Sequence, residues 1–206
     1  MTLLTAKKVI NRRGGFSLNE KSTLRQMLDE YNADVVALGA TLSTPAAAGI
    51  TGGTGTVYES SISKVGGIIT TQIMIDLTGL SSSTTDLDII GQSTPAAHLG
   101  QITAADNGTL LSGWMACLEA PVGGVTDIDL YSATEATGAF DSGIALLTET
   151  AILTHGGAWS AAPQTQTALT AIPAADQYLY LTGGAAGTAA AYTAGKFLIT
   201  FIGYDA

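Results

Sequence analysis

Two short stretches of the sequence repeat a pair of carboxylates at a fixed spacing. The first is TDLDII at Thr85–Ile90 and the second is TDIDLY at Thr126–Tyr131. In each stretch one apolar residue separates two aspartates. Paired carboxylates can bind a metal ion, or they can share the acid and base work of a glycosidase. Which chemistry applies depends on whether the aspartates converge in a loop or lie along a strand.

The alternation of acids and apolar residues is typical of a half-buried strand. Side chains in a strand point alternately to its two faces, so each aspartate pair shares one face and the aliphatic residues share the other. Calcium requires six to eight oxygens, usually from irregular loops, and nothing in the sequence marks an acid as buried. We therefore predict that Asp86, Asp88, Asp127 and Asp129 lie on the solvent face of two strands, with no metal or cofactor.

Other residues suited to catalysis are few and are not arranged in a known motif. Cys117 is the single cysteine and lies in the apolar run GWMACLEA, which favours a buried structural thiol. The two histidines, His98 and His155, lie in Gly/Ala-rich stretches. The glycine-rich stretches GGTGT and GGAAG lack the GK[ST] of a phosphate-binding loop, and no GxSxG, HExxH or CxxC occurs. We predict that the protein is not an enzyme.

The composition suits an all-β extracellular or particle-borne protein better than a typical cytosolic enzyme, and its charge is unevenly divided along the chain. Charged residues make up 12% of the chain and apolar residues 46%, whereas about 25% charged is usual. Six of the eight basic residues lie in the first 25 positions, opposed only by Glu20, so this segment carries +5 and the rest of the chain −14. A basic segment on an acidic body docks on nucleic acid, an acidic protein shell or the body itself, or remains a solvated tail.

The N-terminal part of the sequence predicts an arm followed by a helix. Residues 1–16 show no clear period and contain RRGG. Ser17 and Glu20 form a capping-box signature that starts a helix over 17–43. Its apolar positions are spaced 4, 3, 4, 3 and 4 residues apart, which favours a coiled-coil seam over packing on the chain's own body. The seam positions are Leu24, Leu28, Tyr31, Val35, Leu38 and Leu42.

Beyond the helix the sequence predicts a linker and then a β body. Residues 44–56, TPAAAGITGGTGT, have a linker composition. Eight apolar segments bounded by turn residues follow over 57–206, which is typical of an antiparallel β-sandwich of jelly-roll type. The segments are TVYESSISKV, GGIITTQIMIDLTGL, TTDLDIIG, TLLSGWMACLEA, VTDIDLYS, SGIALLTE, DQYLYLTGG and GKFLITFIGYDA.

The sequence predicts neither a transmembrane segment nor a signal peptide. No run of 18 or more apolar residues occurs. At the N-terminus the apolar residues precede the basic ones, which is the reverse of the order in a signal peptide. We therefore expect synthesis in a host cytoplasm and no membrane partner.

This layout resembles the small virion proteins of tailed bacteriophages, above all capsid decoration (cement) proteins and head-fibre or knob proteins. The resemblance is one of architecture over the whole chain. Four features carry it: the basic arm AKKVINRR, the heptad helix LRQMLDEYNADVVALGATL, the Thr/Ala/Gly-rich β body and the aromatic closing strand GKFLITFIGYDA.

The resemblance implies a passive structural role on the capsid surface. Proteins of this kind are often trimers that clamp neighbouring subunits of the major capsid protein, with N-terminal arms that reach across the shell. On this view Lys7, Lys8, Arg12 and Arg13 contact the capsid, the heptad seam joins three copies, and no nucleic acid is bound. An arm that orders on binding supplies a large contact area, and trimerisation multiplies weak contacts.

The alternative is a phage fibre, spike or knob protein that binds a host-surface glycan. In that case exposed aromatic residues would carry recognition. Trp114 lies inside a predicted strand and is expected in the core, whereas Trp159 lies in the loop-like HGGAWSAAP and is the better candidate. The alternating Tyr178 and Tyr180 fit a strand that is buried on both faces.

Overall fold

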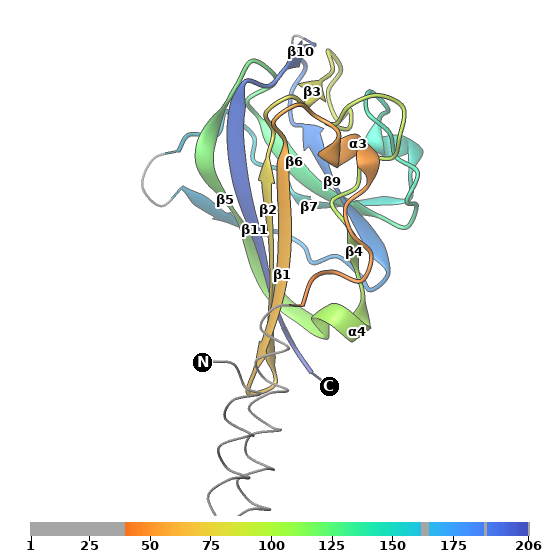
Figure 1. Ribbon diagram of the computed structural model, residues 1–206, viewed down its shortest axis with the longest axis vertical. Coiled ribbons are helices and arrows are strands. Elements are labelled where there is room, and N and C mark those ends of the chain that lie inside the picture. Colours follow the sequence, from red (N-terminus) through yellow and green to blue (C-terminus); the bar gives the residue numbers. More distant parts are fainter. Residues whose placement is uncertain (1–39, 162–164, 188, 206) are drawn as a thin grey trace, which may run out of the picture.

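The structure, a computed structural model, describes residues 40–161, 165–187 and 189–205. These residues form two antiparallel sheets packed face to face, with few helices, so the prediction of a mainly β sandwich is confirmed. The five-stranded sheet runs along the long axis of the body (Figure 1). In spatial order it contains β1 (Val57–Val65), β2 (Ile68–Asp76), β11 (Ala194–Tyr204), β5 (Thr109–Val122) and β8 (Gln166–Ala168).

The second sheet has four shorter strands, and a small two-stranded sheet closes one end of the body. In spatial order the four are β4 (Gln101–Ile102), β9 (Gln177–Gly183), β6 (Ile128–Ala133) and β7 (Glu149–Leu153). The small sheet pairs β3 (Ser81–Ser82) with β10 (Ala190–Ala191). The described helices are α3 (Ala48–Thr51), α4 (Ala104–Asn107) and the 3-10 turn η1 (Ile144–Leu146).

The hairpin of β1 and β2 shows how sequence fixes register in the large sheet. Gly66 and Gly67 have φ angles of 59° and 81°, which is the backbone of a two-residue turn that only glycine adopts without strain. The turn pairs Val65 with Ile68. Alternate residues of β2, among them Ile69, then point to the interior, and the residues between them point outward.

The core lies between the two sheets. Inward side chains from β2, β11 and β5 meet those from β6 and β9, and all are shielded from solvent. At roughly 25 cal/mol per Å² of apolar surface buried, this layer supplies the main stabilisation of the sandwich. The central members are Ile73, Ile75, Met115, Phe197, Ile199, Phe201, Ile128, Leu130, Leu179 and Leu181.

β6 is buried on both faces, because loops cover the side that turns away from the core. Every residue of the strand is buried. Gly138 shows how close the covering loops lie. A Cβ on it would meet Ile89, Tyr180 and Leu147 at 2.7–2.9 Å, and its N–H donates to the Tyr180 hydroxyl at 3.3 Å.

Two of the eight predicted strand segments adopt other structure. TDLDII forms a turn and isolated bridges rather than a strand, with Leu87 at a φ of 63° and both Ile89 and Ile90 fully buried. Consecutive buried residues break the expected alternation. SGIALLTE contains the η1 turn, and only its last residue, Glu149, belongs to β7.

The segment before β1 is packed on the body. Ile50, inside the predicted linker of 44–56, is fully buried in α3. Leu42, predicted at the end of the oligomer seam, is non-helical and 3% exposed in the core of its own chain. The Ala40 carbonyl accepts the Ile62 N–H at 2.7 Å, and the Ser43 hydroxyl donates to Asp106 at 2.7 Å.

The predicted arm of 1–16 lies outside the described residues, and so do its basic residues Lys7, Lys8, Arg12 and Arg13. The same is true of the other five seam residues, which are Leu24, Leu28, Tyr31, Val35 and Leu38. Across 40–161, 165–187 and 189–205, no helix has both the length and the apolar character needed to cross a membrane.

Candidate functional site

The second aspartate pair is buried, which corrects the prediction that it faces solvent. Asp127 is 8% exposed and Asp129 3% exposed. Asp129 lies on β6, and Asp127 lies just before it. Of the first pair, Asp88 is also buried and only Asp86 is exposed. The expected solvent face of β6 is covered by neighbouring segments, so strand alternation alone gave the wrong environment for these acids.

Asp127 and Asp129 converge against a glycine. A Cβ placed on Gly184 would lie 2.8 Å from Asp127 Oδ1 and 2.9 Å from Asp129 Oδ1. Any side chain at 184 would therefore collide with both carboxylates. The Gly184 N–H donates to the Asp127 backbone carbonyl at 2.8 Å, which holds the glycine in place. The absence of a side chain at this position allows two buried acids to approach one point.

His155 completes this cluster from the loop after β7. Its backbone N–H donates to Asp129 Oδ1 at 2.8 Å, and its Nδ1 lies 3.9 Å from Asp127 Oδ1. Nδ1 lies 2.7 Å from the Gly157 carbonyl, so in the neutral ring it is the protonated nitrogen and donates this bond. We call Asp127, Asp129 and His155 the carboxylate cluster.

Trp159 fixes the histidine ring in this position. The two rings stack with centroids 3.8 Å apart and an interplanar angle of 15°. The indole N–H of Trp159 donates to the Ile128 carbonyl at 2.8 Å, and the residue is 3% exposed. Trp159 is therefore part of the core and not the exposed recognition residue that its loop context predicted.

The environment of Asp129 is unfavourable for an ionised carboxylate. Burial is the main cause that raises the pKa of Asp129 above its ordinary value, and the nearby charges of Asp127 and Asp86 raise it further. The hydrogen bond from the His155 N–H opposes this rise. Asp127 Oδ1 is buried and has no hydrogen-bond partner. A buried acceptor without a partner costs stability.

A cavity of about 320 Å³ opens beside Asp127. It lies between the loop that joins β5 to β6 and the loop that follows β9. Apart from Asp127 its walls are small or uncharged. They comprise Gly123, Gly124, Val125, Thr126, Ala185, Ala186 and Gly187.

A second candidate surface is the face of β1, β2, β11 and β5 that points away from the four-stranded sheet. We call it the outer sheet face. Cross-strand partners share a face, so the register defines rows of side chains across it. One row contains Glu59, Met74, Leu198 and Ala116, and the row at the hairpin end contains Val65, Ile68, Tyr204 and Thr109.

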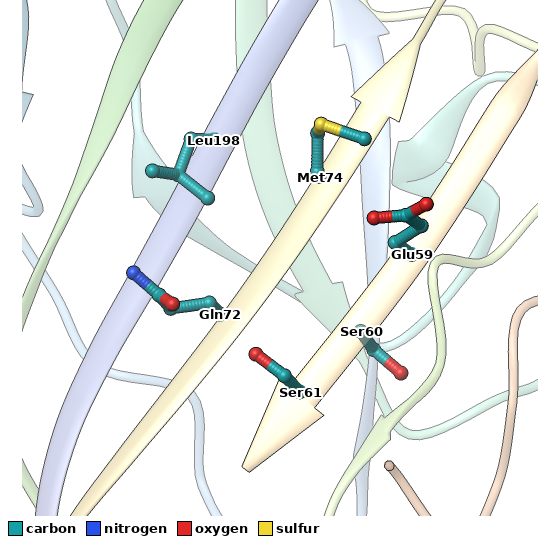
Figure 2. Close-up of a pocket in the computed structure, with 6 residues that line it drawn as sticks. All are labelled: Glu59, Ser60, Ser61, Gln72, Met74 and Leu198. Atoms are coloured by element: carbon teal, nitrogen blue, oxygen red, sulfur yellow. The ribbon is translucent and has the colours of Figure 1, made fainter. Parts of the chain in front are cut away.

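Large apolar side chains are exposed along the outer sheet face. Val65 is 65% exposed, Ile68 46% and Val57 44%. In the middle of the face, Glu59, Ser61, Gln72, Met74 and Leu198 line a shallow hollow of about 240 Å³, which Figure 2 shows across β1, β2 and β11. Val65 and Ile68 lie together at the hairpin end of the face and Val57 lies at its other end, with serine, threonine and glutamine side chains in the rows between them. The exposed pair of Val65 and Ile68 is a candidate contact site.

The outer sheet face carries little net charge. Lys196 lies 3.3 Å from Asp76. Burial opposes ionisation of Asp76, but hydrogen bonds from Thr78 and the ion pair with Lys196 outweigh it and lower the pKa of this carboxyl. The charged residues of this face are Asp76, Glu59, Glu119 and Lys196, which give it a net charge of −2. Residues 26–206 as a whole carry −14.

The remaining residues singled out by the sequence have structural roles. Cys117 is buried, as predicted, with Sγ 3.3 Å from the Glu119 carbonyl. Burial lowers the pKa of His98, whose Nδ1 accepts the Gly100 N–H at 3.2 Å. Trp114, predicted in the core, is only half-buried on the outer sheet face.

Tyr180 is fully buried and Tyr178 half-buried, which confirms that β9 is covered on both faces.

Within the part of the chain that the structure describes, no group of three or more His, Cys, Asp or Glu side chains has an arrangement that would hold a metal ion. The carboxylate cluster has two carboxylates and a histidine whose Nδ1 already faces a carbonyl.

The sequence matches no protein family model, and comparison with curated proteins and with solved structures yields no match.

Sequence reasoning missed the convergence of Asp129, His155 and Gly184, because the three lie on segments far apart in the chain. Thr182 pairs with Asp129 across β9 and β6, so knowledge of that register would have placed Gly184 near the acids. The sequence shows the glycine-rich stretch GGAAG, but it does not show that this stretch lies beside β6.

Proposed function

We propose that the protein is a non-enzymatic structural component of a bacteriophage virion. It assembles as a homotrimer on the capsid surface and clamps neighbouring subunits of the major capsid protein. The observation that supports this proposal is the outer sheet face, a broad and nearly uncharged surface with exposed apolar side chains. The basic N-terminal segment and the heptad pattern of the sequence fit the same role.

The outer sheet face suits contact between copies because of the charge of the molecule. Two copies with bodies at −14 repel each other over most of their surface. On the outer sheet face, exposed apolar residues coincide with a net charge of only −2. Contact there removes Val57, Val65 and Ile68 from water, at roughly 25 cal/mol per Å² of apolar area. Self-association would therefore bury apolar side chains at both ends of the face and depend weakly on salt.

A trimer would strengthen attachment to a shell without any single tight contact. Three arms held together act at a high effective concentration, so that each bound arm favours binding of the next. Lys7, Lys8, Arg12 and Arg13 would anchor each arm to an acidic neighbour. The glycan-binding alternative has less support, because its best candidate, Trp159, is 3% exposed.

The first test compares two glutamate substitutions in the full chain by light scattering. Leu198→Glu places a charge in the centre of the outer sheet face, and Leu146→Glu places one at an 81% exposed leucine of η1 outside it. We expect the wild type and Leu146→Glu to have the mass of a trimer and Leu198→Glu to shift towards the monomer. Circular dichroism should show that both variants remain folded.

A monomeric wild type, or a trimer that survives Leu198→Glu unchanged, would contradict assembly through this face. The virion location needs a separate measurement. An antibody against the protein should label the heads of intact phage particles in electron micrographs. Label on tails, or on no particle, would contradict the capsid role while leaving the self-association result intact.

A further inference from the structure

The edges of the two large sheets differ in how they are protected. An unprotected edge strand presents a row of free backbone N–H and C=O groups to any extended chain. In the four-stranded sheet, the Gln101 N–H of β4 donates to the Thr44 carbonyl at 3.3 Å, and the Ile152 carbonyl of β7 accepts the Thr170 N–H at 2.9 Å. In the five-stranded sheet, β5 is capped by β8, which has three residues. The remaining edge strand is β1, which has nine residues.

The hairpin turn determines which backbone groups of β1 point outward. In a hairpin with a two-residue turn, the two residues that flank the turn exchange backbone hydrogen bonds, and every second pair along the strands repeats this pattern. Val65 and Ile68 flank the turn, so the intervening residues of β1 direct their N–H and C=O groups away from β2. The Ile62 N–H confirms this alternation, because it donates outward to the Ala40 carbonyl at 2.7 Å. The residues that face outward in this way are Tyr58, Ser60, Ile62 and Lys64.

One part of this edge has no cover among the described residues. Ala40 covers the edge at Ile62, whereas Tyr58 and Ser60 make no described backbone hydrogen bond on their outward side. We call residues 57–61 the open edge. It contains no proline, and its pairing with β2 has no bulge, so two of the usual ways of blunting an edge strand are missing. The open edge is therefore ready to accept another strand.

A second copy of β1 fits the open edge poorly. An antiparallel pair centred on Ser60 would place Tyr58 of the second copy opposite Ile62, where Ala40 already lies. A pair centred on Glu59 would place two glutamates directly opposite each other, and like charges in this position are destabilising. A register shifted by one residue would set outward-facing groups against groups that face β2. The open edge therefore suits a foreign strand with a different side chain opposite Glu59.

The side chains of the open edge indicate the chemistry of that strand. Glu59 is exposed, and none of the ion pairs between described residues involves it. A lysine or arginine opposite Glu59 would therefore gain a partner. The charge of −14 on residues 26–206 also attracts a cationic segment. β-branched residues on either side of that cation would favour an extended backbone.

We propose that the open edge binds an extended peptide segment of another protein as an additional antiparallel strand, with a lysine or arginine opposite Glu59. The backbone groups of Tyr58 and Ser60 would supply the affinity, and Glu59 would set the register. This inference goes beyond the proposed function. It does not depend on the oligomeric state, because the new hydrogen bonds lie in the plane of the sheet and not on the outer sheet face.

The test titrates the isotopically labelled full chain with a synthetic peptide of sequence TVKVT, acetylated and amidated at its ends, and follows the backbone amides by NMR. In the proposed register the two valines lie opposite Tyr58 and Ser60, and the lysine lies opposite Glu59. We expect saturable shifts of the Tyr58 and Ser60 amides. At a peptide concentration ten times the dissociation constant, the exchange of these two amides with solvent should slow about tenfold.

Two methylated peptides of equal mass and charge test whether the contact is a strand pairing. N-methylation of the first valine removes an N–H that faces β1, and it should weaken binding about tenfold or more. N-methylation of the lysine backbone removes an N–H that faces away from β1, and it should leave binding unchanged. Equal binding of the two peptides would show that the contact does not use the backbone of the open edge.

Substitutions in the protein test the same contact from the other side. Ser60→Pro removes the outward N–H without removing a bond to β2, which is the position where an edge strand accepts proline. It should weaken binding of TVKVT about tenfold, whereas the matched control Ser60→Ala should bind as the wild type does. Glu59→Gln should weaken binding about threefold, as expected for an exposed charge pair. Circular dichroism checks the fold, and the methylated peptides carry the test if Ser60→Pro does not fold.

Three further results would overturn the proposal. The absence of saturable shifts at Tyr58 and Ser60 would show that the open edge accepts no strand. Slow exchange of these two amides in the free protein, at every protein concentration, would show that another segment of the same chain covers the edge. Slow exchange that develops only as the protein concentration rises would assign the edge to a second copy.

Discussion

Asp129 holds its carboxylate where solvent is largely excluded and two other acids are close. Burial and the charges of Asp127 and Asp86 raise its pKa. An acid whose folded pKa lies above its unfolded value binds protons more readily when folded. The contribution of Asp129 to stability is therefore most favourable below about pH 3.8 and is lost as the pH rises through the folded pKa.

We predict that Asp129→Asn stabilises the protein at neutral pH. Asparagine keeps an Oδ1 acceptor for the His155 N–H and removes the buried charge. The free energy of unfolding at pH 7 should rise by on the order of 1 kcal/mol. In urea titrations the gain should shrink as the pH is lowered towards 3.8 and disappear below it. A loss of stability at pH 7 would mean that the carboxylate is compensated by contacts beyond those described.

At the residue scale, sequence alone identified Cys117 as buried and the two aspartate pairs as notable. It could not identify Asp129 as buried, because its burial comes from Gly184 and His155, which are brought to β6 only by the tertiary fold. The same holds for Trp159, whose loop context is real but whose ring lies in the core.

At the scale of elements, the residues before β1 belong to the body and not to a linker. Leu42 packs in the core, and a Cβ on Gly100 would lie 2.8 Å from its Cδ1. The heptad spacing placed Leu42 in a helical seam between copies, whereas it is non-helical and packs in its own core. Periodicity does not say against what a side chain packs. Glycine and proline in the following stretch gave it a linker composition, although tertiary contacts hold it in place.

We expect Leu42→Ala to lower the free energy of unfolding by about 2–5 kcal/mol, the usual range for a buried leucine. The mass of the folded protein in light scattering should stay the same, because the side chain contacts its own body. Leu28→Ala, a substitution at another heptad position, is the comparison. A lower mass with unchanged stability for Leu42→Ala would return this residue to the seam between copies.

For strands that alternate regularly between apolar and polar residues, the sequence predicted the buried and exposed faces correctly. For segments covered by loops, it predicted the wrong exposure or the wrong structure. β2 and β11 alternate because one face meets the core and the other stays open. β6 is buried on both faces. The segment TDLDII contains a turn at which Leu87 has a positive φ. A pattern with period two predicts a strand, but it cannot report which segments later cover its outer face.

At the scale of the whole molecule, charge is separated between the N-terminal segment and the body. The first 25 residues carry +5 and the remainder −14. We therefore expect contacts made by the proposed arm to be electrostatic and contacts through the outer sheet face to be mainly apolar. Salt screens the first kind of contact and leaves the second largely intact.

We predict that raising the salt from about 0.05 M to about 0.5 M separates the two kinds of association, since the Debye length falls severalfold over this range. Cosedimentation of the protein with phage capsids, which the basic arm is proposed to mediate, should drop about tenfold, whereas the trimer mass in light scattering should persist. If the trimer dissociates and cosedimentation with capsids is unaffected, the assignment of the two kinds of contact is reversed.

The attachment of residues 40–47 also has a mechanical consequence. These residues are tied to the body by separate bonds in sequence: Ala40 to Ile62, Ser43 to Asp106, Thr44 to Gln101 and Ala47 to His98. A force applied through the N-terminal segment loads these bonds one after another, as in peeling, and not all at once. In a protein held by its arm, this strip would yield before the sheets separate, so that it would act as an extensible tether between the anchor and a body that stays folded.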